Sequence, residues 1–306
     1  MSVRIIIQGY KMSFFFNMHL RPTKNNVRVL KENQNAALSK NDDVYDLYSN
    51  YLKDEEQKEP ENRYLNFKNN RKYTYMLEHV TENLGEQYLK LILTVFTEIS
   101  EEDIIQYLTM NDRFGDTVKS TYVTDNGTNI SCSPTSLRYV YQALVILDYY
   151  KTTDCENMVE LGCGYGGLFL AINYFSNILN IHIEKYNIID LPSANKLIEF
   201  YLNMHKDSIT IPYEFHESAK YGATVPSGKL FFISNYCYTE IDIINKNLYY
   251  INLLKRVDNG FIIWQSLTFD LKYMEQIFKD TSKIEMVEEQ PQTCLNASTP
   301  NYFVFF

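Results

Sequence analysis

The chain has 306 residues, enough for one large domain or two, and 45% of them are hydrophobic, as in an ordinary globular protein. Its formal net charge is -9 at pH 7, so no basic surface dominates, and binding to nucleic acid is disfavoured as a general function. The five cysteines show no CxxC or CxxH spacing, which argues against a zinc site and predicts free thiols in a reducing, cytoplasmic setting. The first twenty residues hold only short, broken apolar runs, so we expect neither a signal peptide nor a membrane span.

The first part of the chain changes character at residue 73. Residues 21–70 are polar and charged, which predicts a mobile connector with one short helix near 44–52. Apolar residues from Tyr73 onward recur at helical spacing and predict two helices separated at Gly85.

A third helix is predicted after Ser100, because Ser100 and Asp103 have the spacing of a capping box. We therefore expect residues 1–110 to form a mostly helical N-terminal region that offers a surface for homo-oligomers. Ser133 followed by Pro134 predicts a further helix start, after the turn-rich loop at 111–116.

Beyond residue 156, apolar strands alternate with helical patterns, which predicts a mostly parallel α/β sheet covered on both faces. Only a loop separates the last two strands, so they should pair antiparallel. Six parallel strands with one reversed strand differ from the sheet of a dehydrogenase, which stays parallel. The predicted strands are 158–161, 186–190, 209–215, 229–235, 260–265, 283–288 and 302–306, and the predicted helices are 168–179, 192–204, 243–255 and 271–278.

The stretch MVELGCGYGGLFLAIN, residues 158–173, places four glycines within six residues between a strand and a helix. Such a turn presents free backbone N–H groups and implies a close approach to the backbone. Gly162, Gly164 and Gly167 also fit the dinucleotide fingerprint. Glu160, however, would repel a pyrophosphate and suits the positively charged S-adenosylmethionine (SAM). The run resembles the first motif of Rossmann-like SAM-dependent methyltransferases.

Residues at the ends of the following strands extend this prediction. Asp190 ends the second strand, where an acid accepts hydrogen bonds from ribose hydroxyls, although NAD sites use the same device. Ser218 lies where methyltransferases of this class hold the adenine amine, with ordinary loop polarity as the alternative. The predicted cofactor site consists of Glu160, Gly162, Cys163, Gly164, Gly166, Asp190, Leu191, Ser218, Asn235 and Tyr236.

The fourth strand ends in Asn235-Tyr236-Cys237-Tyr238, which resembles the N-P-P-Y loop of amino methyltransferases that act on nucleic acids, but without the prolines that shape that loop. Their absence and the acidic charge count against a nucleic-acid substrate.

An ordered set of motifs over roughly residues 110–306 resembles the sugar O-methyltransferase family. The resemblance implies a seven-stranded Rossmann-like methyltransferase domain over residues 111–306 and methyl transfer from SAM to a hydroxyl of a nucleotide sugar or glycan. The chain departs from the family in two places. Cys163 lies within the glycine loop, and Cys294-Leu295-Asn296 stands where the family has small residues and glycine. The motifs are NDxxGD (111–116), SPTSLRY (133–139), VELGCGYGG (159–167), IIDLP (188–192), ISNYCYTE (233–240), YYINLL (249–254), NGFI (259–262) and ExPxT (289–293).

A sugar hydroxyl is a weak nucleophile that benefits from a positioned base. Glu240, just past the fourth strand, is the first candidate, and His216 is the second. A helix cap and an ordinary loop histidine are the respective alternatives. The predicted substrate-binding residues are Asp112, Arg138 and Tyr139.

Arg138 could instead form an ordinary salt bridge, or bind a nucleotide phosphate. No metal site is expected, although Asp112 and Asp116 leave room for a divalent ion. Two other functions stay open: a nucleic-acid methyltransferase, and a catalytically silent SAM-binding or scaffolding subunit.

Overall fold

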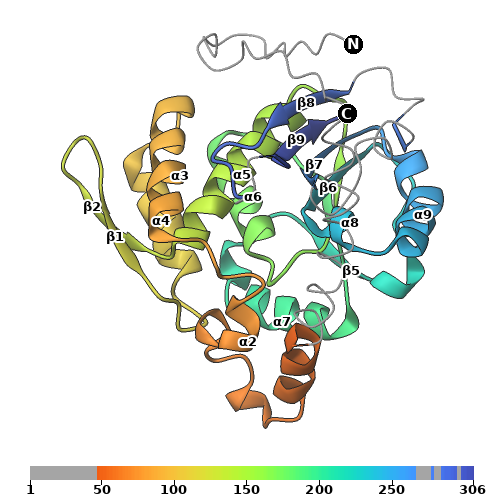
Figure 1. Cartoon of the computed structure of the whole chain (residues 1–306), viewed down its shortest axis with the longest axis horizontal. Coiled ribbons are helices and arrows are strands. Elements are labelled where there is room, and N and C mark those ends of the chain that lie inside the picture. The colour runs from red at the N-terminus through yellow and green to blue at the C-terminus, as the bar shows by residue number, and fades with distance from the viewer. Residues whose placement is uncertain (1–46, 267–276, 279–283, 295–297) are drawn as a thin grey trace.

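A computed structural model describes residues 47–266, 277–278, 284–294 and 298–306. Its centre is a seven-stranded sheet in the order β5-β4-β3-β6-β7-β9-β8 (Figure 1). All neighbouring pairs from β5 to β7 are parallel, whereas β9 runs antiparallel to both β7 and β8. The strands are β3 (Asn157–Leu161), β4 (Lys185–Asp190), β5 (Tyr213–Glu217), β6 (Leu230–Asn235), β7 (Asn259–Gln265), β8 (Glu285–Glu288) and β9 (Asn301–Phe305). The predicted seven-stranded Rossmann-like sheet with an antiparallel last strand is confirmed.

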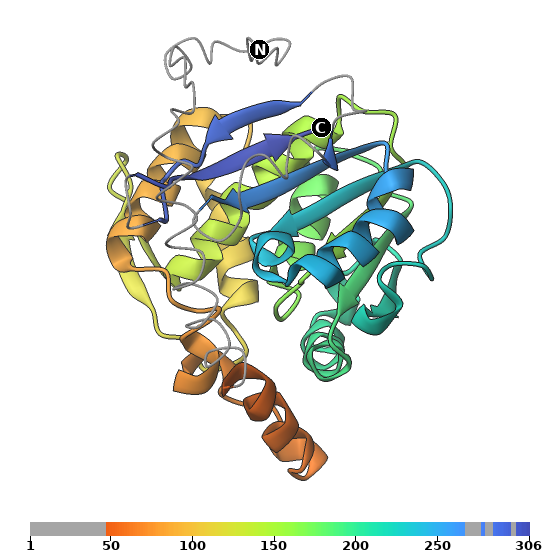
Figure 2. The same cartoon turned by 45° about the vertical axis from the view of Figure 1, so that its right-hand side comes forward.

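The sheet is buried on both faces because its strands are apolar at successive positions. Phe231 and Ile233 of β6 belong to one hydrophobic cluster, and Phe232 between them belongs to another. The first cluster includes α5 (Pro134–Tyr150), α6 (Gly167–Ile178) and α7 (Pro192–Asn203). The second includes residues of α8 (Cys237–Glu240) and α9 (Ile243–Asn252). Figure 2 shows α9 and α5 on opposite sides of the strands.

Local capping signals place two helices where the sequence predicts them. Ser133 caps α5 with its side chain, and Pro134 occupies the first turn. Ser100 and Asp103 form the complete capping box of α4 (Glu101–Asn111).

The predicted helix break at Gly85 is wrong, because Gly85 lies inside α3 (Glu82–Val95). Glycine is required there by packing rather than by a turn. A Cβ atom at this position would lie 2.2 Å from the hydroxyl of Tyr122.

The short helix predicted near 44–52 is confirmed in its described part, but the connector predicted around it is wrong for residues 57–70. Residues 47–56 are helical, and two short 3-10 helices, Pro60–Asn62 and Phe67–Asn69, follow before α2 (Arg71–Thr74). Tyr64 and Phe67 are buried against Phe200 of α7 and Tyr165 of the glycine loop. These buried aromatic residues join the same core as α5, so this segment is part of the folded body. The boundary at 110/111 stays a prediction.

The sequence reading did not include a hairpin formed by β1 (Ser120–Val123) and β2 (Asn129–Cys132). It projects beyond α3 and α4 at the left of Figure 1. The predicted helix at 271–278 lies outside the described residues except for its last two. In the part of the chain that the structure describes, no helix combines the length and the apolar character needed to cross a membrane.

Candidate cofactor and acceptor site

The carboxyl ends of the parallel strands bring the predicted cofactor residues to one edge of the sheet. Leu161, at the end of β3, is in register with Ile189, and Asp190 is in register with Glu217. Cys237, just past β6, lies against Gly162 of the glycine loop. This edge is where open α/β sheets bind ligands.

The glycine loop turns sharply between β3 and α6. Gly162, Gly164 and Gly166 all have positive φ, which L-residues rarely adopt. Much of the need for glycine comes from the protein's own packing. A Cβ at Gly162 would lie 2.3 Å from Cβ of Cys237, and one at Gly167 would lie 2.8 Å from the ring of Tyr139. The glycine run alone therefore does not require a bound ligand.

Asp190 holds the loop in place. Its carboxylate accepts hydrogen bonds from the backbone N–H of Cys163 at 2.7 Å and of Leu191 at 2.8 Å. Burial raises the pKa of Asp190 to about 6, and this effect outweighs the N–H donors, which lower the pKa. Each carboxylate oxygen has a second lone pair, so Asp190 can also accept from a ligand hydroxyl.

Glu160 lies beneath the loop, on the face of the sheet that α5 and α6 cover. Only 2% of it is exposed, and its Oε2 accepts a hydrogen bond of 2.7 Å from the hydroxyl of Tyr186. Burial raises the pKa of Glu160 to about 7, more than the Tyr186 bond lowers it. Glu160 is therefore bound to a protein partner, which weakens the expectation that it is the main partner of a ligand cation.

Asn235 and Tyr236 follow β6 at the same edge. Asn235 donates to Oε1 of Gln142 at 2.9 Å, and both side chains keep a buried polar atom without a partner. Tyr236 has φ 69° and ψ −42°, a strained conformation of the kind found at functional sites. Its hydroxyl donates to Glu289, a buried acid.

Glu289 explains why the ExPxT motif has its spacing. Thr293 donates to Oε2 of Glu289 through both its N–H and its hydroxyl, and Asn301 of β9 donates to the same oxygen at 3.0 Å. The motif thus holds one carboxylate beside Tyr236.

Arg138 is 7% exposed and lies beside the segment 75–81, which joins α2 to α3 and which we call the strap. Its guanidinium donates to the carbonyl oxygen of Leu77 at 3.0 Å, and its Nε is buried without a partner. Glu78, the next residue of the strap, accepts from the hydroxyl of Ser133 at 3.2 Å, and its Oε1 is also unpartnered. The strap therefore brings Glu78 close to Arg138 of α5, and each of these charged side chains keeps one buried polar atom without a partner.

Asp112, predicted to bind substrate, is occupied within the protein. Its carboxylate accepts from the backbone N–H of Ser133 at 2.6 Å and from the hydroxyl of Ser136 at 2.5 Å. These bonds tie the end of α4 to the start of α5, which favours a structural role. Tyr139, by contrast, has its hydroxyl 3.7 Å from the position of a Cβ built on Gly164, so it does border the loop.

The two candidate bases differ in their surroundings. Glu240 is an exposed residue at the end of α8, and it accepts from the side chain of Gln265 at 2.9 Å. The cap of α9 is Asp242, so Glu240 is not used for capping.

His216 is buried in β5. Its ring nitrogens lie 2.9 Å from the hydroxyl of Thr224 and 3.0 Å from Oδ1 of Asn187. Both nitrogens are therefore engaged, which favours a structural role. Ser218 follows β5 and begins a 3-10 helix, Ser218–Lys220, at the same edge.

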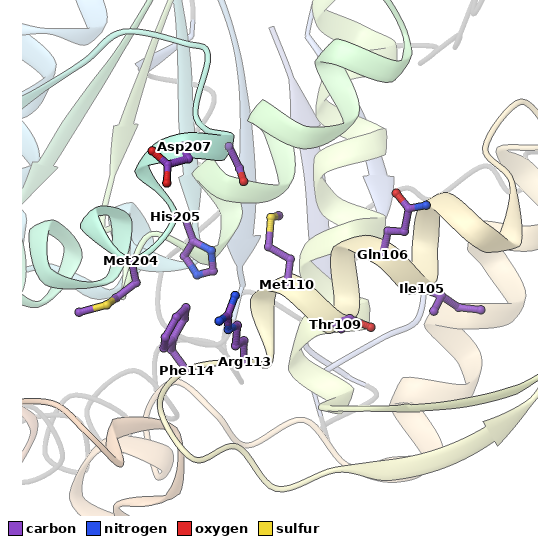
Figure 3. A pocket seen from close by; sticks show the side chains of 10 residues that line it. Ile105, Gln106, Thr109, Met110, Arg113, Phe114, Met204, His205 and Asp207 are labelled. Carbon is purple, nitrogen blue, oxygen red and sulfur yellow. The ribbon is translucent and has the colours of Figure 1, made fainter.

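A cavity of about 550 Å³ lies elsewhere, between α4 and the C-terminal end of α7 (Figure 3). His205, Arg113 and Phe114 line it, and none of its lining residues belongs to the glycine loop. Among the described residues, no group of three or more His, Cys, Asp or Glu is placed to hold a metal ion.

The sequence reading did not include four residues of the site: Glu78, Tyr88, Gln142 and Glu289. Only Glu289 had a signal, since it begins the ExPxT motif. The other three lie on the strap, α3 and α5, and only the packing of these elements brings them to the edge of the sheet.

No family model matches this sequence, and no curated protein matches it either. Solved structures with a similar fold include the methyltransferase domain of bacterial CtHen1-CN, at 13% identity and a TM-score of 0.40 over 55% of this chain and 96% of that one. An rRNA methylase from Streptococcus thermophilus has 13% identity and a TM-score of 0.36, covering 55% and 90% of the two chains. Magnesium protoporphyrin IX methyltransferase from Synechocystis PCC 6803, solved with bound SAM, has 8% identity and a TM-score of 0.39, covering 56% and 77%.

Proposed function

We propose that the chain is a SAM-dependent O-methyltransferase that methylates a hydroxyl of a sugar, in a nucleotide sugar or a glycan. The described residues fit the donor. Asp190 offers acceptors for ribose hydroxyls beside a glycine loop with three positive φ values. The proposal rests on these features together with the sheet, which has the strand directions of this enzyme class.

One observation carries the acceptor assignment. Two buried polar atoms without a partner lie at the end of β6, next to Tyr236, namely Nε2 of Gln142 and Oδ1 of Asn235, whose side chains are hydrogen-bonded to each other. Leaving a buried polar atom unpaired costs about 1–3 kcal/mol, so native proteins rarely do so without a reason. This set mixes donors and acceptors, as the hydroxyls of a sugar require, whereas a phosphate could use only the donors.

Bound SAM supplies the methyl group, and the protein aligns the acceptor and accepts its proton. Glu240 is the proposed base because it is an exposed carboxylate just past β6. Glu289, reached through the hydroxyl of Tyr236, is the alternative that the structure adds. We do not propose His216 as the base, since both its ring nitrogens are engaged.

Calorimetry and a labelled-methyl assay test the proposal together. The purified chain should bind SAM and its product S-adenosylhomocysteine (SAH) but not NADH. It should then transfer label from SAM to a nucleotide sugar or glycan in a panel that also contains DNA and RNA.

Label in DNA or RNA would instead support a nucleic-acid methyltransferase. Binding of SAH without transfer to any compound would support a catalytically silent subunit. Binding of NADH without SAH would refute the proposal as a whole.

A further inference from the structure

The glycine loop runs from Asp190, the proposed ribose site, to the strap. Asp190 accepts from the N–H of Cys163 at one end of the loop. At the next residue, a Cβ built on Gly164 would lie 3.7 Å from both Leu77 of the strap and the hydroxyl of Tyr139. A ligand whose ribose binds Asp190 and which follows the loop therefore reaches the strap.

Two oppositely charged side chains, Glu78 and Arg138, lie at the strap end of the loop, and neither has all its polar atoms hydrogen-bonded. Arg138 and Glu78 each keep one buried polar atom that no described residue satisfies, Nε and Oε1 respectively. No ion pair within 4.0 Å joins them to each other or to any other group that the structure describes. Arg138 instead donates to the carbonyl oxygen of Leu77, the residue before Glu78.

The surrounding charges do not relieve either group. The nearby buried cation Lys68 donates to the carbonyl of Asn111 and lies 4.5 Å above the ring of Tyr165. Asp112 is bound to Ser133 and Ser136. Burial raises the pKa of Glu78 to about 7, more than Lys68 and Arg138 lower it, as expected for a carboxyl group without a contacting cation.

From this placement we propose that Glu78 and Arg138 bind the aminoacyl end of SAM, Glu78 its ammonium group and Arg138 its carboxylate. The assignment rests on the proposed function. A carboxylate and a guanidinium with free atoms suit a zwitterion, because each charge of the ligand meets its opposite. A phosphate at Arg138 would meet the negative charge of Glu78, which counts against that alternative. The N-terminal region thus completes the cofactor site through its strap.

Calorimetry with three probes tests each contact separately. SAH carries both charges of the aminoacyl end, its decarboxylated analogue keeps only the amine, and 5′-methylthioadenosine has neither. Glu78→Gln should weaken binding of SAH and of the decarboxylated analogue by roughly 10- to 100-fold, the usual loss of a charge-assisted contact. Arg138→Gln should weaken SAH alone. Binding of 5′-methylthioadenosine should be unchanged in both variants.

Glu86→Gln, an exposed carboxylate on α3, is the matched control and should bind all three probes as the wild type does. Thermal melting checks that each variant is folded, and Glu78→Ala and Arg138→Met, which also remove the charge, replace any variant that is not. Equal losses for SAH and 5′-methylthioadenosine, or no loss for SAH, would overturn the inference while leaving the proposed function intact. A wild-type protein that binds none of the probes would overturn both.

Discussion

Asp190 offers the most direct test of the cofactor site, because its carboxylate joins the glycine loop to the proposed ribose position. Asp190→Ala removes the acceptor of two backbone N–H groups, those of Cys163 and Leu191. Each buried N–H left unpaired costs about 1–3 kcal/mol, so the two together should lower the free energy of unfolding by about 2–6 kcal/mol. Loss of the ribose acceptors should in addition weaken binding by about 1–3 kcal/mol, roughly a 5- to 100-fold higher Kd for SAH.

Urea unfolding measures the first quantity and calorimetry with SAH measures the second. Asp242→Ala is a matched control, since Asp242 accepts from two backbone N–H groups, of Ile244 and Asn245, at the start of α9. It should cost about 1 kcal/mol of stability, as an N-cap does, and leave SAH affinity unchanged. A folded Asp190→Ala protein that binds SAH as tightly as the wild type would refute the reasoning that places the ribose at Asp190.

Three further predictions concern neighbouring groups. Only the ionised form of Glu78 should bind the ligand ammonium, so SAH affinity should be highest above pH about 7 and fall by up to about tenfold per pH unit below it. Calorimetry between pH 6 and 8 measures this dependence, and the part that comes from Glu78 should be missing in Glu78→Gln. Glu240→Gln should lower single-turnover methyl transfer to a compound labelled in the panel by about 10²–10⁴-fold with unchanged SAH affinity, and normal turnover would move the assignment to Glu289. Gly162→Ala should lower the melting temperature sharply, because its Cβ would lie 2.3 Å from that of Cys237 and its φ is positive; an unchanged melting temperature would contradict the loop geometry.

The sheet, and the position of Asp190 at its carboxyl edge, could be predicted from sequence because their signals are local. Apolar runs and the helices between them define each strand, and a short connection makes the last pair antiparallel. Asp190 was identified for the same reason, since a residue at the end of a parallel strand lies at the ligand edge whatever packs around it. The caps of α4 and α5 depend on residues one to three positions apart.

The tertiary structure alone decided which polar groups remain free. Asp112 and Arg138 look alike in the sequence as candidates for substrate binding, but Asp112 is occupied by Ser133 and Ser136 whereas Arg138 keeps a buried, unpartnered nitrogen. His216 is engaged by Asn187, 29 positions away, a contact that no local pattern encodes. Whether a polar side chain has hydrogen-bond partners depends on the residues packed beside it. The fold sets which residues those are, not their spacing in the sequence.

The same limit explains the error over residues 57–70. Their polar composition predicted a connector, because composition averages over a segment and a few buried aromatic residues are enough to fold it onto a core. Tyr64 and Phe67 pack against α7 and the glycine loop, which lie about a hundred or more positions further along the chain. The strap follows this docked segment in the chain, so the placement of Glu78 beside Arg138 of α5 depends on long-range packing that no local sequence pattern shows.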